Sequence, residues 1–148
     1  MNAQQQVLNA LQAALAAGGT VAGARVYLDR VDPLTSSLLP AILIEETGGE
    51  SAEAIFMNGD QSRTSEITVN CVLAAATTAP ADCRAFGLAV EKIIVANATL
   101  IGLCRGGIVI AHSRTDINGE GDRLLATRQQ SWRFTYFVSR LNPDTINP

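Results

Sequence analysis

The first segment of the chain has the apolar spacing of a helix. Its large apolar residues recur at intervals of three and four, at Val7, Leu8, Leu11 and Leu15. The positions between them are mostly alanine and glutamine, which are strong helix formers. The pattern predicts a helix over Asn2–Ala17 with one apolar side. We expect the chain to turn at Gly18 and Gly19, because glycine readily adopts the left-handed conformation in which many helices end.

The next part of the chain contains short apolar runs that predict strands. Arg25–Leu28 is a strand candidate, and Ala41–Ile44 is a continuous run rich in branched side chains, as in a strand buried on both faces. The segment between them, Asp29–Pro40, is polar and interrupted by proline, which predicts a loop. Gly48–Gly49 is expected to break the second strand, and Ala54–Met57 to form the next one.

A hairpin is predicted after that strand. Asn58–Gly59–Asp60 has the composition of a turn, because Asn and Gly tolerate positive φ. The following arm alternates strictly, since its apolar side chains occupy one face, at Ile67, Val69, Cys71 and Leu73. Polar side chains occupy the positions between them, at Glu66, Thr68 and Asn70. Such alternation is typical of a half-buried antiparallel strand.

The second half of the chain predicts one further helix and two more strands. A helix is expected to begin near Pro80, and its apolar residues recur at helical spacing, at Phe86, Ala89, Val90, Ile93 and Ile94. Ile108–Thr115 predicts a strand, Asn118–Gly121 a turn, and Leu124–Ser139 a long final strand. In that strand, large apolar side chains alternate with polar ones, at Trp132, Phe134, Tyr136 and Val138.

These elements predict an α+β fold. Hairpins dominate and helical crossovers are few, which favours a mixed, largely antiparallel sheet of four to six strands with two helices packed on one face. The length of 148 residues is that of one typical domain. We expect a single domain over residues 1–141 and a disordered tail over residues 142–148.

Composition narrows the classes of partner. The net charge is −3, so the chain has no positive field that would collect nucleic acid or anionic lipid. The charged fraction of 17% is below the usual value of about 25%, which favours burial of surface by self-association. The cations are almost all arginines, with Lys92 as the single lysine. The sequence lacks a run of about 20 apolar residues, so we expect a soluble, intracellular protein.

Candidate chemistry is sparse. Three cysteines without a CxxC pair predict neither a disulfide framework nor a metal site, and no cofactor is expected. His112 is the only histidine, so an enzyme or ligand-binding site would have to use it, with Asp116 nearby, inside a deep pocket. The oxygen-bearing positions 116, 118, 120 and 122 lack the spacing of a calcium loop.

Charge is distributed unevenly along the chain. Between Glu45 and Glu66 there are six acidic residues and one arginine, whereas between Arg105 and Arg140 there are six arginines and three acidic residues. The two groups could match each other within one chain, or they could be complementary faces of a head-to-tail ring. For the ring, the candidate contacts join two sets in neighbouring subunits: Arg114, Arg128 and Arg133 on one side, and Glu46, Glu50 and Glu53 on the other. Salt should then dissociate the ring.

The order of segments along the chain also matches a known pattern. In chain order it comprises an alanine- and leucine-rich helix, a loop leading into Leu39–Ile44, a break at Gly48–Glu50, an arm at Glu66–Val69, a second helix, Ala98–Ile101, a polar strand at His112–Asp116 and an aromatic strand at Trp132–Tyr136. This order resembles the tail terminator family of long-tailed phages, typified by the minor tail protein U of lambda-like phages. The lengths of the loop at Asp29–Pro40 and of the turn at Asn118–Gly121 depart from the family.

The resemblance implies a structural protein without enzymatic turnover. A member of this family forms a hexameric ring on the finished tail tube, stops polymerisation of the major tail tube protein and offers a surface to the head–tail connector protein. It would be assembled in the bacterial cytoplasm and reside at the head–tail junction of the virion tail. DNA would meet it only in transit, and an acidic lumen would repel phosphate. The alternatives are a neck or tail-completion protein of related fold on the head side, or a small ligand-binding domain or enzyme using His112.

Overall fold

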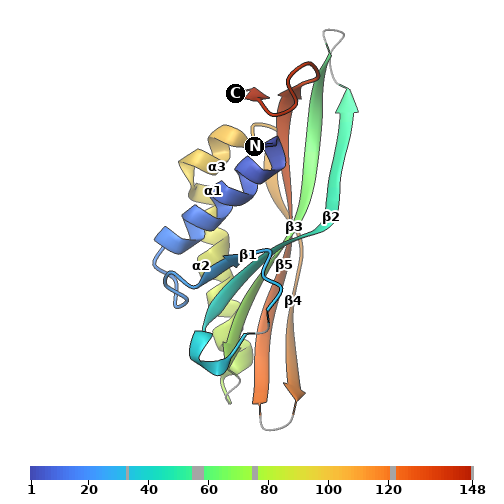
Figure 1. The fold of residues 1–148 in the computed structure, drawn as a ribbon. Coiled ribbons are helices and arrows are strands. Elements are labelled where there is room, and N and C mark those ends of the chain that lie inside the picture. The colour runs from blue at the N-terminus through green and yellow to red at the C-terminus, as the bar shows by residue number, and fades with distance from the viewer. Residues whose placement is uncertain (33, 55–58, 75–76, 121–122, 148) are drawn as a thin grey trace.

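A six-stranded sheet with helices on one face forms the molecule (Figure 1). The computed structural model describes residues 1–32, 34–54, 59–74, 77–120 and 123–147. In chain order the elements are α1 (Ala3–Ala17), β1 (Val26–Leu28), a 3-10 helix η1 (Ser36–Leu38), β2 (Ala41–Ala54), β3 (Asp60–Ala74), α2 (Ala79–Ala96), α3 (Ala98–Leu103), β4 (Gly107–Glu120), β5 (Arg123–Ser139) and β6 (Ile146–Asn147). The predicted α+β class is confirmed, with α3 as a short additional helix.

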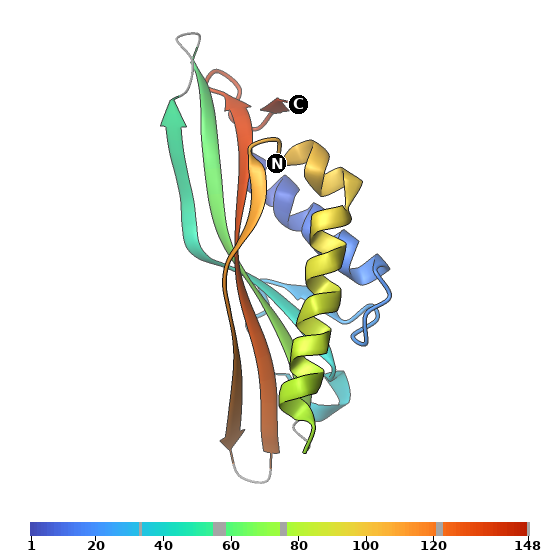
Figure 2. The same cartoon turned by 180° about the vertical axis from the view of Figure 1, so that it is seen from behind.

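The strand order is β1-β2-β3-β5-β4, and β6 pairs with the end of β5. Only β1 and β2 run parallel among the described strand pairs, so the sheet is mixed and largely antiparallel, as predicted. The hairpin of β2 and β3 extends to one end of the molecule, and that of β4 and β5 extends to the other (Figure 1, Figure 2). Helices α1, α2 and α3 cover the middle of one face (Figure 2).

The predicted first helix is α1. The Asn2 side chain caps it by accepting a hydrogen bond of 2.7 Å from the backbone N–H of Gln5, which satisfies one of the free donors of the first turn. The predicted apolar stripe is buried, at Val7, Leu8, Leu11 and Leu15. The helix ends at Gly18, and Gly19 has a φ of 72°, as expected for the glycine pair.

The two faces of the sheet differ in polarity. On β5 the predicted apolar face is buried beneath the helices, at Trp132, Phe134, Tyr136 and Val138. The opposite face carries no helix in the described part of the chain, and many of its side chains are polar and bond to each other across strands. Thr64 bonds to Thr135 with 2.9 Å between their hydroxyl oxygens, and Asn70 donates to Glu45 at 3.0 Å. We call this the open face.

Helix α2 lies close to β5 because it carries a glycine at the crossing. The carbonyl of Gly87 accepts a hydrogen bond of 2.8 Å from the side chain of Gln130. A Cβ atom at Gly87 would lie 2.8 Å from Cγ of Arg128 and 3.0 Å from Nε2 of Gln130. On its outer side α2 exposes Leu88, Lys92 and Val95.

Gly87→Val is therefore expected to lower the free energy of unfolding by about 1–3 kcal/mol, because the added side chain forces the helix and sheet apart. Urea denaturation followed by circular dichroism measures the change. Gly102→Val is the matched control, since a Cβ at Gly102 meets no atom within 4 Å. An equal effect of the two substitutions would contradict close packing at Gly87.

The expected break at Gly48–Gly49 is wrong. Strand β2 continues through these residues to Ala54, with a β-bulge between Glu46 and Gly49. Gly49 has a φ of 74°, and a Cβ at Gly48 would lie 2.6 Å from Cβ of Glu66. The glycine pair thus permits a bulge and a close strand approach without ending the pairing.

Two further expectations need correction. The turn predicted at Asn118–Gly121 is wrong for residues 118–120, because β4 continues to Glu120. The tail is not wholly disordered, because Ile146–Asn147 forms β6 and pairs with Phe137 and Val138. The strand predicted at Ala54–Met57 and its turn fall mainly on residues 55–58, which lie outside the described residues.

Candidate assembly surfaces

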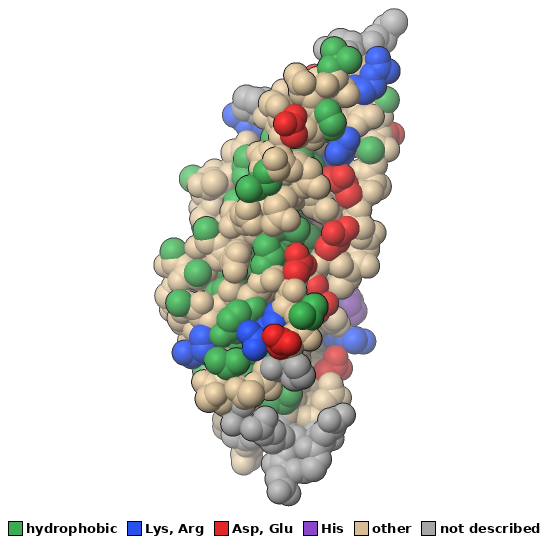
Figure 3. All heavy atoms as spheres, in the orientation of Figure 1, with side chains coloured by type: hydrophobic (Ala, Val, Ile, Leu, Met, Phe, Trp, Pro, Cys, Tyr) green, Lys and Arg blue, Asp and Glu red, His purple; other side chains and the backbone are tan. Residues whose placement is uncertain are grey.

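The six predicted interface residues occupy different strands. Glu46, Glu50 and Glu53 lie on β2, Arg114 lies on β4, and Arg128 and Arg133 lie on β5. Because β3 and β5 lie between β2 and β4, the acidic group and Arg114 lie towards opposite edges of the sheet. Acidic side chains gather in a column on the β2 side of the molecule (Figure 3).

Glu50 is engaged within its own chain. Its carboxylate accepts a hydrogen bond from the Tyr136 hydroxyl and forms a 3.3 Å ion pair with Arg63. Ser65 bonds to the same hydroxyl, with 2.8 Å between the two oxygens. Burial and the neighbouring Glu50 raise the pKa of Tyr136, which therefore stays neutral and can donate. The cluster ties the three long strands β2, β3 and β5 together.

Arg133 and Arg114 also have partners in the same chain. Arg133 lies 3.6 Å from Glu66, and the two side chains are 58% and 51% exposed. Arg114 lies 3.1 Å from Asp116 and donates to Gln129 at 2.8 Å. Exposed pairs of this kind contribute about 0–1 kcal/mol. Each of the two arginines can therefore leave its partner for another acidic group at a small cost in free energy.

The sequence predicted that Arg128 contacts an acidic residue of a neighbouring subunit, but the structure does not place Arg128 on the open surface. It lies on the helix-facing side of β5 and is partly buried beside Gly87. Its guanidinium donates to Thr115 at 3.0 Å and to Ser113 at 2.9 Å. The alternation of β5 accounts for this position, because even-numbered residues of that strand face the helices. A contact between Arg128 and another subunit stays untested.

Glu46 and Glu53 are exposed. Neither has an ion pair with any residue that the structure describes. Of the six predicted residues, these two are the acids that a neighbouring chain could reach without breaking an internal contact. The sheet order, which the sequence did not predict, is what places them along an edge.

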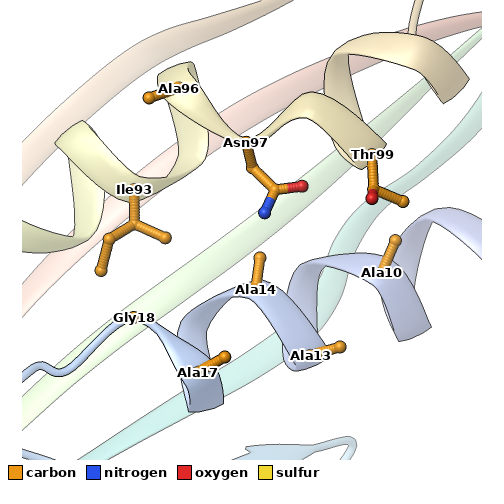
Figure 4. A pocket seen from close by; sticks show the side chains of 9 residues that line it. All are labelled: Ala10, Ala13, Ala14, Ala17, Gly18, Ile93, Ala96, Asn97 and Thr99. Carbon is orange, nitrogen blue, oxygen red and sulfur yellow. The ribbon is translucent and has the colours of Figure 1, made fainter.

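His112 lies on the exposed surface of the sheet. It is an exposed residue on β4, paired in register with Ser131, and Asp116 is bonded to Arg114. A groove of about 380 Å³ runs between α1 and the α2–α3 junction (Figure 4). Its lining is mostly alanine, with Ile93, Asn97 and Thr99. None of the described residues that line this groove is ionisable, and His112 is not one of them.

The three cysteines are buried and unpaired. Burial raises the pKa of Cys71 and of Cys104 to about 12. A thiol with such a pKa is protonated and unreactive at neutral pH. Within the described part of the chain, no group of three or more His, Cys, Asp or Glu side chains is arranged to hold a metal ion.

No helix among the described residues combines the length and apolar character needed to cross a membrane. No protein-family model matches the chain, and a search of curated proteins finds no significant match.

Proposed function

We propose that this chain is a structural tail terminator of a phage or prophage, which forms a ring on the end of the tail tube, stops tube growth and provides the surface for head attachment. The proposal rests on the order of segments in the sequence and on one feature of the shape. Two long hairpins extend to opposite ends of the molecule, one formed by β2 and β3 and the other by β4 and β5 (Figure 1).

That shape suits a subunit with different partners at its two ends. In a ring of equally oriented copies, one set of hairpins would point to the tube and the other to the head connector. Each hairpin is long because its strands of 14–17 residues pair along nearly their whole length. On the open face Arg114 is paired with Asp116 and Arg133 with Glu66, so this face would offer little net positive charge to DNA sliding past it.

Length control is the decisive test. Tail tube protein polymerising in the presence of this chain is expected to give short tubes with one capped end, and tubes grown without it are expected to be long and variable. Electron microscopy measures the length distribution, and multi-angle light scattering measures the mass of the free protein. Equal tube lengths with and without the protein would refute the terminator function.

Arg114→Glu is expected to lower the mass of the free oligomer and to make length control more sensitive to salt, because Arg114 lies on the edge strand β4. The substitution should leave the fold intact, because the Arg114–Asp116 pair is exposed and contributes little. Arg84→Glu is the matched control, since Arg84 is an exposed arginine on α2, away from the sheet. An unchanged mass for Arg114→Glu would remove Arg114 from the interface.

A further inference from the structure

Both edges of the sheet have unpaired strand segments. On one edge, β1 pairs only with Ile42–Ile44 of β2, so the described remainder of β2 has β3 as its single neighbour. On the other edge, β5 is the one strand in the described ranges that pairs with β4, along Gly107–Glu120. Every second residue of such an edge directs its N–H and C=O groups away from the sheet, where they can pair with another strand.

The features that usually keep an edge strand from pairing with another chain are weak here. Neither β2 nor β4 contains a lysine or a proline, which are the residues that most often block edge pairing. Each strand carries one irregularity, between Glu46 and Gly49 on β2 and between Ile110 and His112 on β4. Beyond these bulges, Gly49–Ala54 and His112–Glu120 are regular.

The strand directions allow the two edges to meet in a ring. β2 is antiparallel to β3, β3 to β5 and β5 to β4, so β2 and β4 run in opposite directions. Copies around a ring share one orientation. The β4 edge of one copy would therefore meet the β2 edge of the next as an antiparallel pair, which continues the alternation already present in the sheet.

Charge on the open face fits this contact. Ser51 and Glu53 of β2 lie on that face, because Ser51 is opposite Thr64 and Thr64 bonds to Thr135 there. His112 and Arg114 of β4 lie on the same face, since Arg114 bonds to Gln129. Arg114 lies near the His112 end of the β4 segment, and Asp116 and Glu120 lie farther along it. Glu53 of one copy would thus be placed beside Arg114 of the next.

The two edge segments, Gly49–Ala54 of β2 and His112–Glu120 of β4, lie at different positions along the length of the sheet. Gly49–Ala54 is level with Arg133–Val138 of β5, whereas His112–Glu120 is level with Arg123–Ser131. Pairing them displaces each copy along the strand direction relative to its neighbour. Closed sheets require such a stagger, because their strands tilt relative to the axis.

We propose that copies of this chain join head to tail by antiparallel pairing of β4 (His112–Glu120) of one copy with the free part of β2 (Gly49–Ala54) of the next. The sheet then continues from subunit to subunit, and backbone hydrogen bonds hold the ring while the charges of the open face set the pairing. This inference rests on the proposed function for the existence of the ring.

A pair of charge-reversed variants tests the contact. The basic-edge variant carries Ser51→Arg and Glu53→Arg, and the acidic-edge variant carries His112→Glu and Arg114→Glu. Alone, each brings like charges together at every interface, so its light-scattering mass is expected to fall towards that of the 15.6 kDa subunit. An equimolar mixture is expected to restore the wild-type mass, because basic β2 edges then meet acidic β4 edges in alternation around a ring with an even number of subunits.

Arg84→Glu is the control for charge reversal and should leave the mass unchanged. Amide hydrogen exchange on the wild type gives a second, independent readout. The amides of Gly49–Ala54 and His112–Glu120 that point away from the sheet are expected to exchange at least tenfold more slowly in the ring than in the diluted subunit, with α2 unchanged. Equal exchange in the two states, or a mixture that stays at the mass of the separate variants, would overturn edge pairing.

These experiments test the terminator function and edge pairing independently, so that one can be refuted while the other stands. If the mixture restores the mass but the protein does not limit tube length, the terminator function is refuted and edge pairing stands. If length control holds but the mixture fails, the ring exists and its subunits meet through other surfaces. A wild-type protein that stays monomeric at every concentration overturns edge pairing directly.

Discussion

Trp132→Ala is expected to lower the free energy of unfolding by about 3–5 kcal/mol, which is a large part of the 5–15 kcal/mol that stabilises a typical domain. Trp132 is 1% exposed at the centre of β5, and its ring centroid lies 6.1 Å from that of Phe134. Removing the indole leaves a cavity in the core between the sheet and the helices. It also removes the donor that bonds to Gln130 at 3.1 Å.

Trp132→Phe separates these two contributions. It retains most of the apolar volume but leaves the Gln130 carbonyl oxygen without its donor, which is expected to cost about 1–3 kcal/mol. Val109→Ala is the control, since Val109 is 57% exposed on the adjacent strand and should change stability by less than about 0.5 kcal/mol. Circular dichroism must follow unfolding, because Trp132 is the only tryptophan. Equal losses for alanine at both positions would contradict the packing described.

Alkaline pH is expected to unfold the protein well before its arginines lose charge. Burial raises the pKa of Cys71 and of Cys104 from 9.0 to about 12 in the folded state. A raised folded-state pKa gives stability that is complete below pH 9 and is lost as the pH rises towards 12, because only the unfolded chain releases the protons. For two thiols the loss is on the order of 5 kcal/mol by pH 11.

The test compares urea midpoints between pH 8 and 11 under reducing conditions. The double variant Cys71→Ala/Cys104→Ala is expected to have a urea midpoint that changes less with pH than that of the wild type, whatever its stability at pH 8. Tyr136 adds to the loss only above about pH 10, where a tyrosine in an unfolded chain ionises. If the urea midpoint of the double variant falls between pH 9 and 10 as much as that of the wild type, other groups cause the alkaline unfolding.

The sequence predicted the buried parts of the fold well, because their signals are local and periodic. The stripe of α1 and the alternating apolar residues of β5 are buried where the spacing placed them. The glycine pair Gly48–Gly49 led to a wrong prediction, since a bulge and a strand end share the same residue preference. Only the pairing with β3 distinguishes the two, and that contact is not local.

The candidate interface was harder to predict, because charge along a sequence does not say which strand lies beside which. The sequence singled out Glu50 and Arg128 by charge alone. In the structure Glu50 bonds to Tyr136, 86 positions away, and Arg128 lies beneath α2. The free edges of β2 and β4 depend on the strand order, which no periodicity encodes.

The single lysine has a practical consequence for experiments on this protein. Lys92 is exposed on the outer side of α2, whereas the strands β2 and β4 contain no lysine. Amine-directed dyes or surface tethers will therefore attach at this helix and at the chain's amino terminus. Fluorescence anisotropy of a probe on Lys92 can follow assembly in real time while both margins of the sheet stay chemically untouched.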